Sequence, residues 1–379
     1  MADVVIVGGG VVGSAVAYYL TKAGAGVTLV ERDGLAAGAS GAAAGMLTPP
    51  PEAAASGAFR DLCRAAADVY PSLVEALRDE TGIDVQYLGS GLLLVAETEA
   101  RARALQMVVR WSAQTGGRLA ASGGGLGLEW VEDGPLRRLE PGIAQGVWGA
   151  AYSPDARHVN PGLVTQALAQ AAAARGATLR LGTAVTGFVR RDSRVAGVRT
   201  SEGDRIAADR VVLAAGPWAG RLARGLGADV PTRPMRGQML AYQYTGVRHI
   251  LWGEDGYLVP KAGGFLFVGA TVEDVGFRPR TTRRGLAGLR RMAAATVPAL
   301  RYQEEVSAWA GLRPGTPDGL PIIGLLPGWD HVYVAGGHFR NGILLGPLTG
   351  KLIAQLVTEG RTEMPLEAFS PSRFATSRG

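Results

Sequence analysis

The stretch Val4-Val5-Ile6-Val7-Gly8-Gly9-Gly10-Val11-Val12-Gly13 decides the fold class of this chain. Its apolar, mostly β-branched residues 4–7 predict a buried strand, and the glycines predict a tight turn that opens a helix running to about residue 23. A second apolar strand, Val27–Val30, ends at Glu31. Strand, glycine turn, helix and strand in this order predict a βαβ unit with a parallel sheet.

The spacing Gly8-x-Gly10-x-x-Gly13 also predicts a function. The first glycine permits the sharp bend, the second lets the backbone approach a pyrophosphate, and the third lets the helix pack closely on the strand. The helix N-terminus offers N–H groups to phosphates, and Glu31 can accept hydrogen bonds from ribose hydroxyls. The alternative is a purely structural turn. The strand, the helix and the acidic residue together favour a dinucleotide site, and the single fingerprint favours one dinucleotide over two.

Composition limits the class of protein. The 379 residues are 47% hydrophobic and 19% charged, which suits a globular chain long enough for two domains. The net charge of +6 comes from dispersed arginines, so we expect attraction for anionic cofactors and carboxylates and no nucleic-acid binding. The single cysteine, Cys63, excludes an internal disulfide and lies on an apolar stripe with helical spacing. Because we find neither a signal-peptide pattern nor a membrane-spanning apolar stretch, we expect a cytoplasmic protein without membrane contact.

Two kinds of segment alternate along the chain and predict interleaved domains. Nucleotide-binding-like segments occupy residues 1–85, 150–225 and 325–370, and strand-rich segments occupy 86–149 and 226–324. The other predicted elements that matter below are a strand at 86–96 with a Gly-Ser-Gly kink at 89–91, helices at 99–116, 281–296 and 342–359, and a frayed polar tail after Pro371.

Two later segments have the character of nucleotide-contacting turns. The apolar strand Arg210–Ala214 runs into Ala215-Gly216-Pro217-Trp218, which is typical of a second nucleotide-contacting strand or of an ordinary buried parallel strand. The segment Ala335–Pro347 is a glycine-rich turn that feeds a helix. Its N–H groups and dipole would stabilise negative charge on a reduced flavin, and the alternative is a simple loop.

Arg313 lies in the segment 310–321, which is rich in glycine and proline. A guanidinium on such a rigid, turn-rich segment is a natural partner for a carboxylate, because it can make two parallel charge-assisted hydrogen bonds. We therefore predict that Arg313 anchors a substrate carboxylate. The alternative is a structural ion pair with Asp318.

In their order and spacing the motifs resemble the D-amino-acid oxidase superfamily over essentially the whole chain, and within it the glycine oxidases. The resemblance rests on the fingerprint with Glu31 and on five further segments: Ala42–Leu47, Gly256–Pro260, Gly269–Thr271, Trp309–Thr316 and Gly337–Leu345. It implies an α/β plus α+β fold. A Rossmann-like, glutathione-reductase-type FAD-binding domain (1–85, 150–225 and 325–370) would be interleaved with an antiparallel-sheet substrate domain (86–149 and 226–324).

The resemblance also implies the residues of the site. Arg313 would bind the substrate carboxylate, and Tyr257 and Arg340 would shape the pocket. Relatives with covalent flavin use a cysteine near the C-terminal flavin loop, and this chain has none there, so the FAD would be non-covalent. The residues expected to hold it are Gly8, Gly10, Val11, Val12, Gly13, Glu31, Arg32, Ala39, Ser40, Ala44, Gly45, Met46, Val185, His338, Phe339, Arg340, Asn341, Gly342, Ile343 and Leu344.

The implied reaction is the oxidative deamination of glycine, other small amines or D-amino acids. Hydride transfer from the substrate carbon to flavin N5 requires no side-chain base and no metal, and the imino acid hydrolyses to the keto acid and ammonia. O₂ would reoxidise the flavin and release H₂O₂, and the product would supply the thiazole of thiamine. The chain would form a homo-oligomer.

Two departures from the family pattern leave the substrate open. Val272 follows Gly269-Ala270-Thr271 where glycine oxidases can carry methionine, and the segment Gly253–Gly256 contains no histidine. The alternatives are a D-amino-acid dehydrogenase or a sarcosine or proline oxidase of the same superfamily, and a non-catalytic flavin-binding subunit or sensor. The lack of an amphipathic basic helix disfavours a membrane-linked dehydrogenase, and Arg313 beside Tyr257 disfavours a pure binder.

Overall fold

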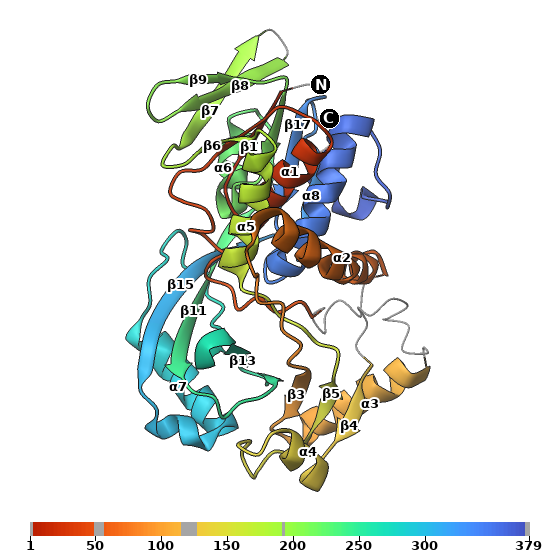
Figure 1. The fold of residues 1–379 in the computed structure, drawn as a ribbon, viewed down its shortest axis with the longest axis vertical. Helices are drawn as coiled ribbons and strands as arrows, with labels where there is room; N and C mark the ends of the chain where they lie inside the picture. Colours follow the sequence, from red (N-terminus) through yellow and green to blue (C-terminus); the bar gives the residue numbers. More distant parts are fainter. Residues whose placement is uncertain (1–2, 49–56, 115–126, 192–193, 376–379) are drawn as a thin grey trace.

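The computed structural model describes residues 3–48, 57–114, 127–191 and 194–375. The last two residues of the helix predicted at 99–116 lie outside these residues. In the described part of the chain the strands form three sheets. The two larger sheets occupy the upper and lower halves of the molecule in Figure 1.

The upper half is built on the predicted βαβ unit. Its sheet has the order β16-β17-β10-β1-β2-β6, and every neighbouring pair is parallel except β16 with β17. The strands are β1 (Val4–Val7), β2 (Val27–Val30), β6 (Thr178–Arg180), β10 (Arg210–Leu213), β16 (Ile322–Leu325) and β17 (Val332–Gly336).

Both faces of this sheet are covered, which explains the continuous apolar run of β1. Val4 and Ile6 pack with helices on one face, and Val5 and Val7 pack with a small sheet and a short helix on the other. The helices of the first face are α1 (Val11–Lys22), α2 (Gly57–Thr81), α5 (Pro161–Ala174) and α8 (Gly342–Glu359). The second face carries β7 (Val185–Arg191), β8 (Arg194–Thr200), β9 (Arg205–Ala207) and α6 (Ala219–Arg224).

The lower half is an eight-stranded sheet with the order β15-β11-β14-β13-β12-β3-β5-β4. It is antiparallel, as predicted, except where β12 runs parallel to β3. Its strands are β3 (Leu92–Ala96), β4 (Glu129–Val131), β5 (Gly149–Ser153), β11 (Arg233–Gln243), β12 (Ile250–Trp252), β13 (Tyr257–Lys261), β14 (Phe265–Gly269) and β15 (Glu305–Gly315). The helices of this half are α3 (Glu99–Gln114), α4 (Asp133–Leu139) and α7 (Arg283–Thr296).

Several predicted elements are confirmed. The helix after the fingerprint is α1, the C-terminal helix is α8, and α2 buries the stripe that contains Cys63. The predicted helix at 281–296 begins two residues late, because Thr282 is its N-cap and accepts a hydrogen bond from the N–H of Gly285.

Three predictions were wrong in detail. The strand predicted at 86–96 begins only at Leu92. The predicted kink is present, since Gly91 has a left-handed backbone (φ 64°), but Gln86 is left-handed as well (φ 57°), and no strand forms before the kink. Arg313 lies on β15 and not in a turn, since the turn follows Gly315. The tail after Pro371 is held through Phe374, because Arg373 binds the Asp318 carboxylate at 2.7 Å.

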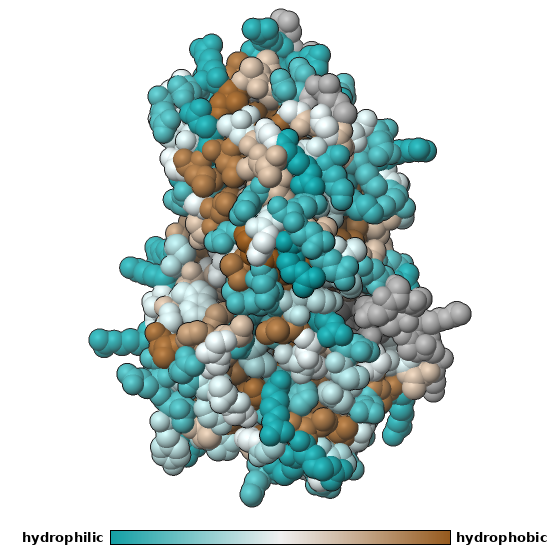
Figure 2. Space-filling view, in the orientation of Figure 1, coloured by the Kyte–Doolittle hydropathy of each residue, from teal (hydrophilic) through white to brown (hydrophobic). Residues whose placement is uncertain are grey.

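The division into two interleaved domains stays a prediction, and the sheets differ from its boundaries at two strands. β5, in the segment assigned to nucleotide binding, pairs in the eight-stranded sheet. β16, which begins before residue 325, pairs in the six-stranded sheet. None of the described helices is long and apolar enough to cross a membrane. On the face shown in Figure 2, hydrophobic residues form small groups among hydrophilic ones.

Candidate cofactor and substrate site

A cavity of about 1050 Å³ is lined by residues of both large sheets. It extends from the β1–α1 turn, past the loop at 37–46, to β15 and the turn before α8. This volume lies at the upper end of the usual range for ligand pockets, about 300–1,000 Å³. Most residues predicted to hold the cofactor line it: Gly8, Gly10, Val11, Val12, Glu31, Arg32, Ala39, Ser40, Ala44, Gly45, Met46, Val185, His338, Phe339, Arg340, Asn341, Gly342 and Ile343.

The other two residues predicted to hold the cofactor, Gly13 and Leu344, do not line the cavity. A Cβ on Gly13 would lie 1.9 Å from the Gly8 carbonyl oxygen, so this glycine permits α1 to approach the turn. Leu344, in the first turn of α8, is 1% exposed and packs into the hydrophobic core. Its side chain therefore stabilises the helix that carries the site and does not contact the cavity.

The fingerprint turn presents backbone to the cavity. Gly8 has φ 116°, and a Cβ there would lie 2.5 Å from the Ala214 carbonyl oxygen, so no other residue fits without displacement. The N–H of Gly9 donates to Glu31 Oε2 at 2.6 Å, which fixes the turn against the end of β2. Arg32 stacks on the ring of Trp218 at 4.6 Å, joining the β2 end to the predicted Ala215–Trp218 turn.

Two helix N-termini open on the same cavity. α1 begins at Val11, and α8 begins at Gly342 after an N-cap residue, Asn341, that makes no side-chain capping hydrogen bond. Neither helix has an acidic residue in its first turn. The N–H groups and dipoles of both helices therefore favour negative charge inside the cavity.

The turn before α8 is tied to its surroundings at two points. The N–H of Phe339 donates to the Pro314 carbonyl at 3.0 Å, which joins the turn to β15. His338 Nε2 lies 2.9 Å from Thr349 Oγ1, and burial lowers the pKa of His338 to about 4. His338 is therefore neutral at neutral pH and part of the wall. Arg340 also lines the cavity and lies over the ring of Phe339.

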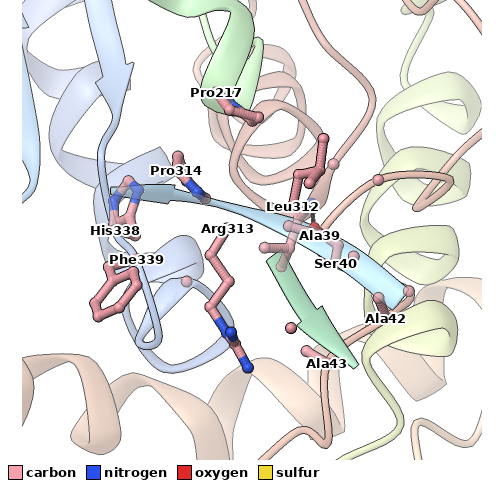
Figure 3. Close-up of a pocket in the computed structure, with 18 of the residues that line it drawn as sticks. Ala39, Ser40, Ala42, Ala43, Pro217, Leu312, Arg313, Pro314, His338 and Phe339 are labelled. Atoms are coloured by element: carbon pink, nitrogen blue, oxygen red, sulfur yellow. Dashed lines mark hydrogen bonds between the residues drawn. The ribbon is translucent and has the colours of Figure 1, made fainter. Parts of the chain in front are cut away.

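Arg313 projects from β15 into the cavity. Figure 3 shows its side chain extending between the His338–Phe339 turn and the loop that carries Ala42 and Ala43. Its Nη1 donates to the Thr271 carbonyl at 2.9 Å. On the neighbouring strand β11, a Cβ at Gly237 would lie 2.3 Å from Nη1, so this glycine leaves the space that the guanidinium occupies.

The alternative role of Arg313, an ion pair with Asp318, is not what the structure shows. Asp318 binds Arg373 instead. Arg313 donates to the Thr271 carbonyl and makes a second hydrogen bond with the Tyr257 hydroxyl, so the remaining guanidinium N–H groups are available to an anion.

Tyr257 lies beside Arg313 and lines the same cavity. Burial raises the pKa of its hydroxyl, while the Arg313 charge and a hydrogen bond from Arg313 oppose that increase. The ring packs edge-to-face on Trp252 at 6.1 Å, and the hydroxyl lies 3.9 Å from Met239 Sδ. A fixed cation beside a tyrosine hydroxyl can hold a small carboxylate in one orientation.

Sequence reasoning did not predict that the cavity is lined by Gly237, Met239, Trp252 and Trp309. Gly237 and Met239 alternate along β11, so the two-residue period of a strand could have assigned them to one face. Trp252 and Trp309 become neighbours of Tyr257 and Phe267 only through strand pairing.

Comparison with known proteins identifies the family. The sequence profile of a family described as FAD dependent oxidoreductase matches residues 3–356. The chain belongs to this family of FAD-dependent oxidoreductases. Like them it uses FAD as cofactor, and it has the mixed α/β fold of the glycine oxidase structures.

Individual members of the FAD-dependent oxidoreductases align over nearly the whole chain. A glycine oxidase of Geobacillus kaustophilus (strain HTA426) is 37% identical over 376 residues, which cover 98% of this chain and 97% of that protein. The crystal structure of glycine oxidase from Geobacillus kaustophilus matches with a TM-score of 0.91 and 35% identity, and covers 99% of both chains. A bifunctional ThiO/ThiG protein of Trichormus variabilis is 35% identical over 98% of this chain and 55% of its own length.

The cavity of this FAD-dependent oxidoreductase fits the cofactor of its family. The turn at Gly8 excludes a side chain, and the N-termini of α1 and α8 favour the pyrophosphate. The N–H of Val11 donates to Ser40 Oγ at 3.0 Å, which fixes the cavity loop at the start of α1. The Glu31 carboxylate lies at the end of β2, where a ribose hydroxyl would reach it.

Proposed function

We propose that this chain catalyses the FAD-dependent oxidative deamination of glycine and other small amines or D-amino acids. Written for glycine, the reaction converts glycine, O₂ and water to glyoxylate, ammonia and H₂O₂. FAD, when bound, supplies the acceptor for the hydride, two electrons and one hydrogen, that leaves the substrate Cα–H bond as the C–N bond becomes C=N. The chain's own residues bind the substrate, orient it and exclude water.

The observation that carries the proposal is the Arg313 guanidinium in the wall of the cofactor cavity. The guanidinium donates to the Thr271 carbonyl and is hydrogen-bonded to the Tyr257 hydroxyl. Its remaining N–H groups are available to a substrate carboxylate. Binding a carboxylate there would place the adjacent amine-bearing carbon at a fixed position in the cavity. Orientation of this kind is a major source of catalysis when no side-chain base takes part.

The glycine oxidases that align with nearly all of this chain support glycine as substrate. A D-amino-acid dehydrogenase or a sarcosine or proline oxidase would need the same carboxylate anchor, so the substrate and the acceptor decide between them. A non-catalytic flavin subunit would not need an arginine with N–H groups available to a substrate carboxylate beside the cofactor. O₂ as acceptor, the homo-oligomer and the cytoplasmic location belong to this proposal. The bifunctional ThiO/ThiG relative supports a role for the product in thiamine thiazole synthesis.

The test is anaerobic bleaching of the flavin absorbance of the purified protein. Glycine, sarcosine, D-alanine, D-proline and L-alanine are added in turn without oxygen, and air is then admitted. We expect glycine and small amines to bleach the flavin, with ammonia during turnover and H₂O₂ after air. Bleaching by D-proline or sarcosine alone would move the assignment to the related oxidases. A flavin that no substrate bleaches would contradict the proposal.

A further inference from the structure

Ala44, Gly45 and Met46 form part of the cavity wall, and the segment Arg157–Val159 holds this loop from the side opposite the cavity. The N–H of Val159 donates to the Gly45 carbonyl at 3.0 Å, and the N–H of Leu47 donates to the Arg157 carbonyl at 2.9 Å. Met46 and His158 are therefore opposed as an isolated antiparallel bridge. In a pair of this kind the N–H and C=O of the central residue point away from the partner strand.

A buried lysine completes this support. Lys261, at the end of β13, is 9% exposed. Its Nζ donates to the Val159 carbonyl at 2.7 Å and to the Ala44 carbonyl at 3.0 Å, and lies 3.2 Å from His158 Nδ1. An ammonium group has three donors and no acceptor, so these three contacts use all of its hydrogens.

His158 continues the network. It is fully buried, and burial, followed by the Lys261 charge, lowers its pKa to about 3. The ring is therefore neutral, and because Lys261 donates to Nδ1 the ring hydrogen is on Nε2. Nε2 lies 2.9 Å from Ser90 Oγ, which accepts it. The chain Ser90–His158–Lys261 thus links β13 to the cavity loop through side chains that are all paired.

The consequence concerns two backbone N–H groups. The carbonyls of Ala44 and Gly45 both point back toward Lys261 and Val159. Because the C=O and N–H of a trans peptide unit point in opposite directions, the N–H groups of Gly45 and Met46 point the other way, toward the cavity that these residues line. Among the described residues, neither N–H group donates to another backbone group of the protein.

We propose that Lys261 is a positioning residue for FAD: with His158 and Ser90 it fixes the Ala44–Gly45 and Gly45–Met46 peptide units so that their N–H groups donate to acceptor atoms of the bound cofactor. A buried polar network that is fully satisfied holds a single geometry, and that geometry presents two adjacent donors to the cavity. Lys261 itself does not line the cavity and acts through the Ala44 carbonyl.

The first test compares cofactor binding in two lysine variants. Lys261→Met removes the three donors at nearly constant size, and Lys351→Met removes a lysine of α8 that is 38% exposed and paired with Glu363. Apoprotein is titrated with FAD, and the quenching of flavin fluorescence gives Kd. We expect Kd to rise at least tenfold in K261M with a shifted flavin absorption spectrum, and to stay within twofold in K351M. A wild-type Kd and spectrum in K261M would overturn the proposal.

A second test needs no variant that has to fold. Hydrogen–deuterium exchange of peptides covering residues 44–47 is measured in wild-type apoprotein and in the FAD complex. Donation to the cofactor predicts at least tenfold slower exchange of the Gly45 and Met46 amides in the complex. Equal exchange with and without FAD would overturn the assignment of these donors.

Ser90→Ala, which removes only the last acceptor of the network, is expected to raise Kd by a smaller factor than K261M.

Discussion

Arg313 is the residue on which substrate binding depends in the proposed reaction. Replacing it with methionine removes charge-assisted hydrogen bonds, each worth about 1.5–3 kcal/mol, so we expect KM for glycine to rise by roughly tenfold to several hundredfold. FAD should stay bound, because the predicted cofactor contacts are elsewhere. Initial rates and the flavin absorbance measure the two effects. An unchanged KM would contradict the anchor, and loss of FAD would assign Arg313 a structural role.

Glu273 accepts a hydrogen bond from the Thr271 hydroxyl, and the Thr271 carbonyl accepts one from Arg313, so Glu273 supports Arg313 through Thr271. Burial raises the pKa of its carboxyl, but hydrogen bonds from Arg236, Thr271 and Gln238 outweigh burial and lower the pKa from 4.5 to about 2. The folded pKa lies below the unfolded one, so the stabilisation is present above pH 4.5 and is lost as the pH falls toward 2.

We therefore expect Glu273→Gln to lower the Tm at neutral pH, and the difference from wild type to shrink as the pH falls from about 5 toward about 3. Thermal unfolding across this range measures it. Glu304→Gln, on an exposed residue, is the matched control and should change little at any pH. A difference that stays constant with pH would show that the Glu273 carboxylate does not contribute as argued.

At the scale of elements, the crossing of α1 and α8 places both helix N-termini at the cavity. α8 presents Gly346 and Gly350 to α1. A Cβ on Gly350 would lie 2.5 Å from Ala15 Cβ, and one on Gly346 would lie 3.0 Å from Val11 Cγ1. The helices therefore approach more closely than side chains at these positions would permit.

Gly350→Ala tests this packing. Overpacking typically costs about 1–3 kcal/mol, which exceeds the gain of up to about 1 kcal/mol from replacing a helical glycine with alanine. The control is Gly288→Ala in α7, where an added Cβ meets nothing nearer than Arg291 Nη2 at 4.0 Å, so helix propensity should dominate. Urea unfolding of the apoprotein should show a loss for G350A and a neutral or stabilising effect for G288A. Equal effects would refute the close-packing argument.

At the scale of the whole molecule, the cavity joins the two large sheets, so cofactor binding should stabilise both. A ligand that binds only the folded state adds about 2.7 kcal/mol at a concentration one hundred times its Kd. We expect FAD to raise the Tm of the apoprotein in a concentration-dependent way and to leave a single transition. Thermal unfolding followed by circular dichroism measures this shift. Two separated transitions with FAD bound would show that the halves unfold independently.

The cofactor side of the site and the helices around it were predictable from the sequence, because the residues that form them are close together along the chain. The fingerprint turn, Glu31, the buried stripe of α2 and the start of α8 each follow from residues within a few positions of one another. Gly13 and Leu344 fell outside the cavity because a motif does not specify which side of its backbone faces a ligand. The strand predicted at 86–96 failed because the left-handed conformation of Gln86 has no strong signal in a single sequence.

The sequence alone determined the family, the cofactor and the candidate carboxylate anchor, because glycine turns, helix starts and charged residues act over short distances along the chain. Only the tertiary structure decided that Arg313 lies on a strand and bonds Thr271, 42 positions away, while Asp318 bonds Arg373. It alone brought Lys261 to Ala44 across 217 positions. Strand pairing and burial select such partners, and the hydrogen bonds that satisfy a buried charge form only after distant segments have packed together.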